Sequence, residues 1–212
     1  MAITMRKFMA ALLTIWVGLS GAVLLTINSP WLLRWTLTPH VLHTVGLSAA
    51  QVMDNYYQLL AYLELPWVNR LSLPNFPFSR GGLIHMATVK KLFLANSVTL
   101  ILALGGLLLI WRHISREKQE WRMLRFFQTS IVLTPLVIFF LGVDFDRYFI
   151  IFHQIIFSDN YWIFDPKTDP IINVLTDRFF TLSFMVMGIL FELYMIIFYR
   201  VIKKQVLTQT SV

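Results

Sequence analysis

Four long stretches of the chain are almost entirely apolar, and more polar segments separate them. The apolar stretches are residues 8–27, 92–111, 126–143 and 179–199. The hydrocarbon core of a bilayer is about 30 Å thick, so a helix needs about 20 apolar residues to cross it. The pattern predicts an all-α membrane protein with four transmembrane helices, in which residues 1–212 form a single integral membrane domain.

The segment between the first two spans, residues 28–91, is much longer than a turn needs and predicts a small helical cap. Ser48 and Gln51 have the spacing of a capping box, so we expect a helix to begin near Ser48. Apolar and aromatic residues then recur at helical intervals, at Met53, Tyr56, Tyr57, Leu60 and Leu63. Three prolines indicate a loop after this helix, and we expect the next helix to begin near Leu83 or Ile84.

Residues 144–178, between the last two spans, predict a helix lying along the membrane surface. Its aromatic face would consist of Phe149, Phe152, His153, Ile156 and Phe157. Tyr161, Trp162 and Phe164 continue the aromatic belt. Two Asp-Pro pairs, Asp165-Pro166 and Asp169-Pro170, predict turns that return the chain to the last span.

Composition and charge agree with a membrane protein. The chain is 57% hydrophobic and 14% charged, which leaves too little polar surface for a soluble globule. The net charge of +7 does not indicate nucleic-acid binding, because no basic stripe is interleaved with exposed aromatic residues. Basic residues flank the spans on one side, within residues 6–7, 112–125 and 200–204. The positive-inside rule therefore places both termini in the cytoplasm and residues 28–91 and 144–178 outside the plasma membrane.

Smaller segments and the cysteine count add further expectations. Residues 112–125 are expected to be a short charged connector, and the polar tail 205–212 is expected to be disordered. The chain contains no cysteine, which excludes disulfides, thiolate nucleophiles and cysteine-ligated zinc in this chain.

Two of the five histidines share one predicted depth in the membrane. His85 and His153 both map to the outer membrane boundary, although packing with a satisfied hydrogen bond is the commoner role for an interfacial histidine. His40 and His43 could share a helical face, whereas His113 lies in the charged connector. Glu192 is the one acid inside a span. It could be a functional residue, or a protonated side chain that bonds a neighbouring helix.

The motifs around these two histidines resemble those of the lipoprotein intramolecular transacylase (Lit) family. The match rests on His85-Met86-Ala87-Thr88-Val89-Lys90 and on Phe152-His153-Gln154-Ile155-Ile156-Phe157, followed by Trp162, Asp165-Pro166, Asp169 and Phe179-Phe180. Thr88 departs from the pattern where we expect an acidic residue, as does Thr176 where we expect a proline. The resemblance implies transfer of the sn-2 acyl chain of a diacylglyceryl cysteine to its own α-amino group, which gives an N-acyl, S-monoacylglyceryl (lyso) bacterial lipoprotein.

The resemblance also implies roles for individual residues. His85 would be the general base and His153 would protonate the leaving oxygen or stabilise the oxyanion, although these roles could be exchanged. Lys90, Asn160, Trp162, Asp169 and Tyr57 would support or contact the substrate. We expect no metal and no cofactor, a diacylglyceryl-modified lipoprotein and membrane lipids as partners, and a monomer.

Two other functions stay open on the residues alone. One is a metal-dependent membrane hydrolase, in which His85, His153 and Asp169 or another outer acid would hold zinc. The other is a non-enzymatic lipid-binding protein that uses its aromatic outer surface to hold a lipid or another membrane helix. Such a protein would tolerate replacement of the histidines by glutamine.

Overall fold

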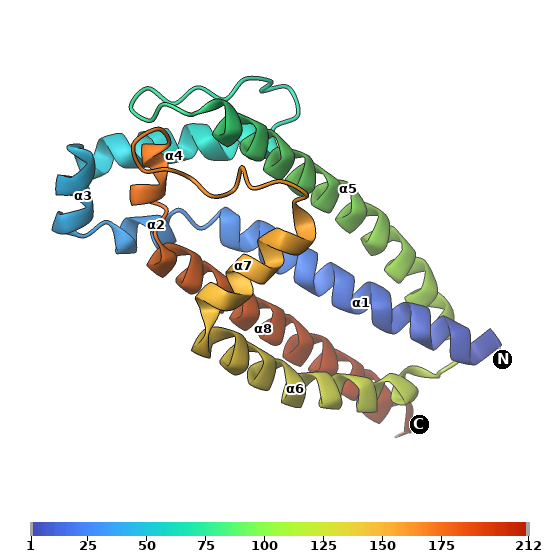
Figure 1. The fold of residues 1–212 in the computed structure, drawn as a ribbon. Helices are drawn as coiled ribbons and strands as arrows, with labels where there is room; N and C mark the ends of the chain where they lie inside the picture. The colour runs from blue at the N-terminus through green and yellow to red at the C-terminus, as the bar shows by residue number, and fades with distance from the viewer. Residues whose placement is uncertain (1, 211–212) are drawn as a thin grey trace. The chain divides into compact units, whose positions relative to one another are not determined.

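The computed structural model describes residues 2–210, and every regular element in that range is helical. The helices are α1 (Ala2–Ile27), α2 (Trp31–Thr36), α3 (Pro39–Val45), α4 (Ala49–Glu64), α5 (Arg80–Arg116), η1 (Glu120–Met123), α6 (Leu124–Val143), α7 (Phe145–Ile156), η2 (Pro170–Asn173) and α8 (Asp177–Thr210) (Figure 1). Four stretches in the described range are long and apolar enough to cross a membrane: Met5–Ile27, Arg80–Arg116, Glu120–Val143 and Asp177–Gln209. The predicted all-α architecture with four membrane helices is confirmed.

The chain divides into two compact units, and the division falls within the four long helices. The first unit comprises residues up to Leu25, Ser97–Phe140 and the chain from Met185 onward. The second comprises Thr26–Asn96 and Leu141–Phe184. The second unit therefore contains α2, α3, α4, α7 and η2, together with the first residues of α5 and α8 and the last residues of α1 and α6.

The core of the first unit is built from residues of all four long helices. Its buried members are Ala10, Ile114, Met123, Phe127, Met195 and Ile202. Only 11% of the most apolar window of α5 is buried, and only 6% of that of α6. Apolar surface exposed to this degree cannot be stable in water, so lipid has to cover it.

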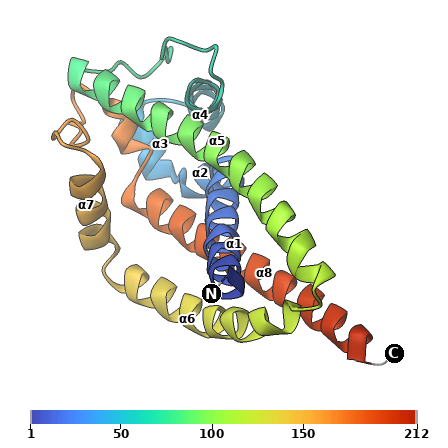
Figure 2. The ribbon, with the colours of Figure 1, turned by 90° about the vertical axis from the view of Figure 1, so that its right-hand side faces the viewer.

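In the second unit, the cap helix begins where its sequence predicts. Ser48 is the N-cap of α4 and forms the expected capping box with Gln51. The loop 65–79 then returns from the end of α4 to the start of α5, and Figures 1 and 2 both show it in teal. Asn55, which is buried, holds this loop: its Nδ2 donates to the Asn75 side chain at 2.8 Å, and the Asn75 backbone N–H donates to its Oδ1 at 3.1 Å.

Three boundaries differ from those expected. Helix α5 begins at Arg80, before Leu83, because the Ser79 hydroxyl accepts the Gly82 N–H at 2.9 Å and caps the helix. The connector 112–125 is largely helical, since α5 runs to Arg116 and η1 leads directly into α6. The entrance to α8 uses Thr176, whose hydroxyl accepts the Phe179 N–H at 3.4 Å, in place of the expected proline.

The expectation of a disordered tail is wrong for residues 205–210, which continue α8. No glycine or proline follows Arg200, so nothing in the sequence ends the helix there. Val206 packs against the core of the first unit, and the Gln209 amide donates to Glu120 at 3.2 Å. Residues 211 and 212 lie outside the described range.

Two glycines of α1 offer a matched test of helix packing in the first unit. A Cβ on Gly18 would lie 2.5 Å from Cδ1 of Tyr194, whereas a Cβ on Gly21 would meet nothing within 4 Å. Both Gly→Ala changes gain helix propensity, and only the first forces a packed aromatic ring to move. We expect Gly18→Ala to be less stable than Gly21→Ala by about 1–3 kcal/mol, measured by thermal unfolding in detergent. Equal stability of the two variants would contradict this packing.

Candidate functional site

Six side chains of the second unit form what we call the histidine–aromatic cluster: His85, Phe149, His153, Phe157, Trp162 and Phe164. Helix α5 supplies His85, α7 supplies Phe149 and His153, and the segment after α7 supplies the rest. The two imidazole rings lie 6.1 Å apart, centroid to centroid. The Phe157 ring contacts both, at 4.6 Å from His85 and 5.4 Å from His153. Residues distant in sequence are thus brought into one contact group.

The aromatic face predicted for the surface helix divides into two. Phe149, His153 and Phe157 are spaced by four residues, so they share one side of the helical turn and enter the cluster. Phe152 and Ile156 are 54% and 42% exposed, and therefore belong to the outer surface. An exposed apolar face of this kind is typical of a helix that lies against lipid with that face.

One hydrogen bond decides the protonation pattern of His153. Its Nδ1 lies 2.8 Å from the carbonyl oxygen of Phe149, which can only accept, so Nδ1 must carry the proton. In the neutral ring, Nε2 then keeps its lone pair. Burial lowers the pKa of His153 below the usual 6.5, and the bond to Phe149 opposes that shift. Burial therefore favours the neutral form of His153, in which Nε2 is able to accept a proton.

Two buried polar atoms of the cluster have no hydrogen-bond partner within the described chain. They are Nδ1 of His85 and Nε1 of Trp162. His85 is only 8% exposed, and the rings of Phe157 and Phe164 contact it. Leaving a buried polar group unpaired costs roughly 1–3 kcal/mol, so such groups in a native protein call for an explanation. The indole N–H can only donate, whereas an imidazole nitrogen donates or accepts according to its protonation.

Asp169 joins the segment after α7 to the start of α5. Its side chain is buried, and Oδ1 accepts the backbone N–H of Ser79 at 2.8 Å, while Oδ2 accepts the Thr168 hydroxyl at 2.7 Å. A Cβ on Gly82 would lie 2.1 Å from Oδ1, so a larger residue there would displace the carboxylate. The bond holds the helical turn that precedes His85 against the segment that carries Trp162 and Phe164.

The other predicted supporting residues lie outside the cluster contacts. Lys90 is buried, and its Nζ donates to the carbonyl oxygens of Leu65 and Val68, so it holds the loop 65–79 in place. Tyr57 and Asn160 are exposed, and neither has a hydrogen bond or ring contact with the cluster in the part of the chain that is described. Two features near the site were not predicted from the sequence: Ser79 caps α5, and Gly82 leaves room for the Asp169 carboxylate. The signal in the sequence that could have indicated the cap is the Ser-x-x-Gly spacing of Ser79 and Gly82.

The remaining histidines and Glu192 do not join the cluster. His40 and His43 are exposed on α3, and His113 pairs with Glu117 at 2.9 Å in the first unit. Glu192 is in the first unit and interacts with Thr134. Across residues 2–210, no group of three or more His, Cys, Asp and Glu side chains is arranged to hold a metal ion.

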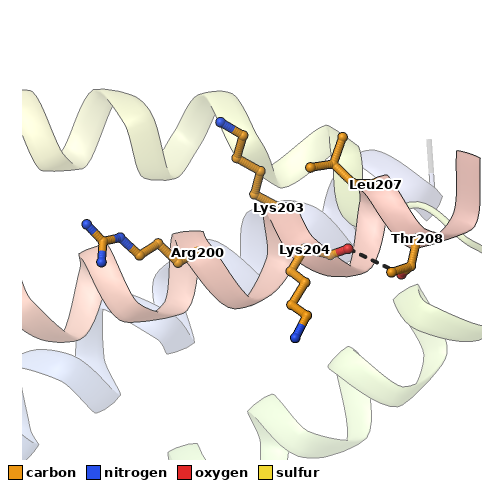
Figure 3. A pocket seen from close by; sticks show the side chains of 5 residues that line it. All are labelled: Arg200, Lys203, Lys204, Leu207 and Thr208. Carbon is orange, nitrogen blue, oxygen red and sulfur yellow. Dashed lines mark hydrogen bonds between the residues drawn. The ribbon is translucent and has the colours of Figure 1, made fainter. Parts of the chain in front are cut away.

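A surface depression is present at the end of α8, in the first unit. It is lined by Arg200, Lys203, Lys204, Leu207 and Thr208. Figure 3 shows the charged ends of Arg200, Lys203 and Lys204 extending away from the helix. None of the residues of the histidine–aromatic cluster lines this depression.

The fold is that of a known class of integral membrane protein. The structure of the membrane integral lipoprotein intramolecular transacylase Lit from Bacillus cereus matches with a TM-score of 0.91 and 20% sequence identity, over 99% of this chain and 98% of that one. Two structures of that protein carrying the H85R and H85A mutations match with a TM-score of 0.85 and 20% identity, over 98% and 99% of this chain and 93% and 96% of theirs. A comparison with curated proteins gives no match.

The model of the lipoprotein intramolecular transacylase Lit family matches residues 8–180, which is most of the chain. The chain therefore belongs to the Lit family, as its two histidine motifs suggested. It is an integral membrane acyltransferase that acts on lipoproteins.

The pKa of His153 is open to direct measurement. In protein carrying ring-labelled histidine in detergent micelles, we expect the NMR titration of His153 to have its midpoint below pH 6.5, because burial disfavours the charged ring. The signal is assigned by its loss in His153→Gln. The rate of a step that needs the neutral ring should therefore increase as the pH rises through this midpoint, and it should stay high at pH values above the midpoint. A midpoint above 6.5 would contradict the burial of this ring.

Proposed function

We propose that the chain transfers the sn-2 acyl chain of a diacylglyceryl cysteine to the α-amino group of the same cysteine, by acid and base catalysis at His153 and His85. The observation that carries the proposal is the hydrogen bond from His153 Nδ1 to the Phe149 carbonyl oxygen, which leaves Nε2 as a base beside a second imidazole. Because the ester and the amine belong to one molecule, the site has only to hold them in attack geometry.

The first step is attack of the amine on the ester carbonyl. An α-amino group has a reference pKa near 7.7–8.0 and is largely protonated at pH 7, so it first loses one proton to solvent. The neutral amine then attacks, and its nitrogen has to pass a second proton to a base. His153 Nε2 takes that proton as the C–N bond forms. The resulting imidazolium keeps its Nδ1–H bond to Phe149, which stabilises the charged ring.

The second step is loss of the glyceryl oxygen. As the C–O bond breaks, this oxygen needs a proton, and the two imidazoles are the groups of the cluster that can supply one. We assign this role to His85, whose Nδ1 makes no hydrogen bond within the described chain. The assignment exchanges the roles first expected from the sequence. As the C–O bond breaks, the proton held by His153 passes to His85 through the substrate or solvent while His85 gives one to the leaving oxygen, so both rings end neutral.

Several further features belong to the same proposal. The chain is a single membrane domain in the plasma membrane, its termini are cytoplasmic and the cluster lies at the extracellular face. It acts as a monomer and needs neither a metal nor a cofactor. Asp169, Lys90 and Trp162 support the site through their contacts, while Tyr57 and Asn160 remain candidates for contacts made by the substrate.

Replacement of either histidine tests the chemistry. In cells that lack this modification, we expect wild-type protein to yield lyso-lipoprotein and His85→Gln or His153→Gln to lower the rate at least about 10²-fold, since acid and base catalysis contributes 10²–10⁴. Mass spectrometry of N-terminal lipopeptides gives the readout. His40→Gln, an exposed histidine on α3, is the matched control and should keep full activity. Full activity of His153→Gln would remove this residue from the mechanism.

Treatment with a chelator distinguishes the proposed transacylase activity from that of a metal-dependent hydrolase. Asp169, the third ligand that such a hydrolase would use, already accepts bonds from Ser79 and Thr168. We expect purified protein treated with a strong chelator to keep its activity. Loss of activity with recovery on adding zinc would instead support the hydrolase.

The absence of cysteine allows a simple test of orientation. Asn69 in the loop 65–79 and Gln205 near the end of α8 are both exposed. In intact cells, a membrane-impermeant maleimide should label Asn69→Cys, and it should label Gln205→Cys only after permeabilisation. The reverse pattern would invert the proposed topology.

A further inference from the structure

The indole of Trp162 presents an unused hydrogen-bond donor beside the proposed base. Its Nε1 is buried and has no partner within residues 2–210, while its ring lies 4.9 Å from the ring of His153 and tilts 32° from it. An indole N–H can only donate, so it cannot be satisfied by another donor. A polar group left unpaired next to a reactive nitrogen is explained if the substrate supplies its partner.

The proposed reaction creates a need for such a donor. When the amine attacks, the carbonyl oxygen of the ester becomes an oxyanion, while His153 Nε2 is occupied with the amine proton. Donors placed in advance at this oxygen commonly give one of the largest contributions to catalysis of acyl transfer. The donor has to keep its own proton at every pH at which the enzyme works, and an indole does so.

Other donors around the cluster are already committed. The ammonium group of Lys90 bonds the carbonyl oxygens of Leu65 and Val68, and the backbone N–H of Ser79 bonds Asp169. The Nδ1–H of His153 bonds the carbonyl of Phe149. Trp162 and His85 therefore hold the buried polar atoms of the cluster that are still unpaired, and His85 is required for the leaving oxygen.

We propose that the indole N–H of Trp162 donates a hydrogen bond to the ester carbonyl oxygen and stabilises the oxyanion of the tetrahedral intermediate. This inference rests on the proposed function. As the C–N bond forms, the electron pair of the carbonyl moves onto its oxygen, which accepts the Trp162 N–H. As the C–O bond to glycerol breaks, the carbonyl re-forms as an amide. Trp162 keeps its proton throughout, and its bond is strongest while the oxygen is charged.

Trp162→Phe removes the donor and keeps an aromatic ring. We expect kcat for lyso-lipoprotein formation to fall about 10²–10³-fold, as on loss of one oxyanion donor, with KM little changed. Thermal stability should not fall, because the resting protein makes no hydrogen bond through this atom. Trp67→Phe, the same change at a 71% exposed position of the same unit, is the matched control and should leave kcat unchanged. An unchanged kcat in Trp162→Phe would overturn the proposal.

A second replacement keeps the test decisive if Trp162→Phe disturbs packing. Benzothienylalanine, introduced at position 162 by nonsense suppression, has the shape of tryptophan with sulfur in place of the N–H. Loss of kcat in this protein supports the donor role, and wild-type kcat overturns it. The wild-type chain and His153→Gln, tested in the same assay, distinguish a failure of the proposed function from a failure of the role given to Trp162. If the wild type forms no lyso-lipoprotein, the proposed function fails; if the wild type is active and the isostere equals it, only the role of Trp162 fails.

Discussion

The hydrogen bond from the Ser79 backbone to the Asp169 carboxylate determines where the two histidine-bearing segments of the second unit meet. Ser79 caps α5, and His85 follows less than two turns later. Asp169 ends the irregular segment that begins at the end of α7 and carries Trp162 and Phe164. The carboxylate is buried, and Gly82 leaves it just enough room, so the contact admits little variation. The placement of both sides of the histidine–aromatic cluster depends on it.

Within that frame, aromatic rings and backbone carbonyls control the chemistry of the imidazoles. Rings of Phe149, Phe157 and Trp162 contact His153 and partly bury it, which favours the neutral form of its side chain. The Phe149 carbonyl selects the tautomer, a role that a carboxylate performs in many other enzymes. A site that handles an acyl ester gains from this arrangement, because the neutral ring keeps the Nε2 lone pair free for the proton that the amine has to lose.

The cost of the site is visible in its unpaired atoms. Folding leaves His85 Nδ1 and Trp162 Nε1 buried without partners in the described chain, which lowers the stability of the second unit. The cap offsets part of this cost with well-satisfied polar contacts, such as the Asn55–Asn75 pair and the bonds of Lys90 to the loop carbonyls. Two of the six such atoms in the described chain thus lie where a substrate has polar atoms to offer, and the other four belong to Thr26, Glu120, Glu192 and Tyr194.

The sequence by itself determined the membrane helices, the capping box at Ser48, the surface helix and the two histidine motifs, because each of these is a local pattern of polarity or spacing. It misjudged the start of α5 and the tail, where a cap at Ser79 and the packing of Val206 extend the helices. Only the tertiary structure decided that His85 meets His153, which side of α7 faces inward, and that Lys90 holds a loop. These depend on contacts between segments far apart in the chain, and no local pattern records which partner a buried carboxylate, ammonium or indole will find.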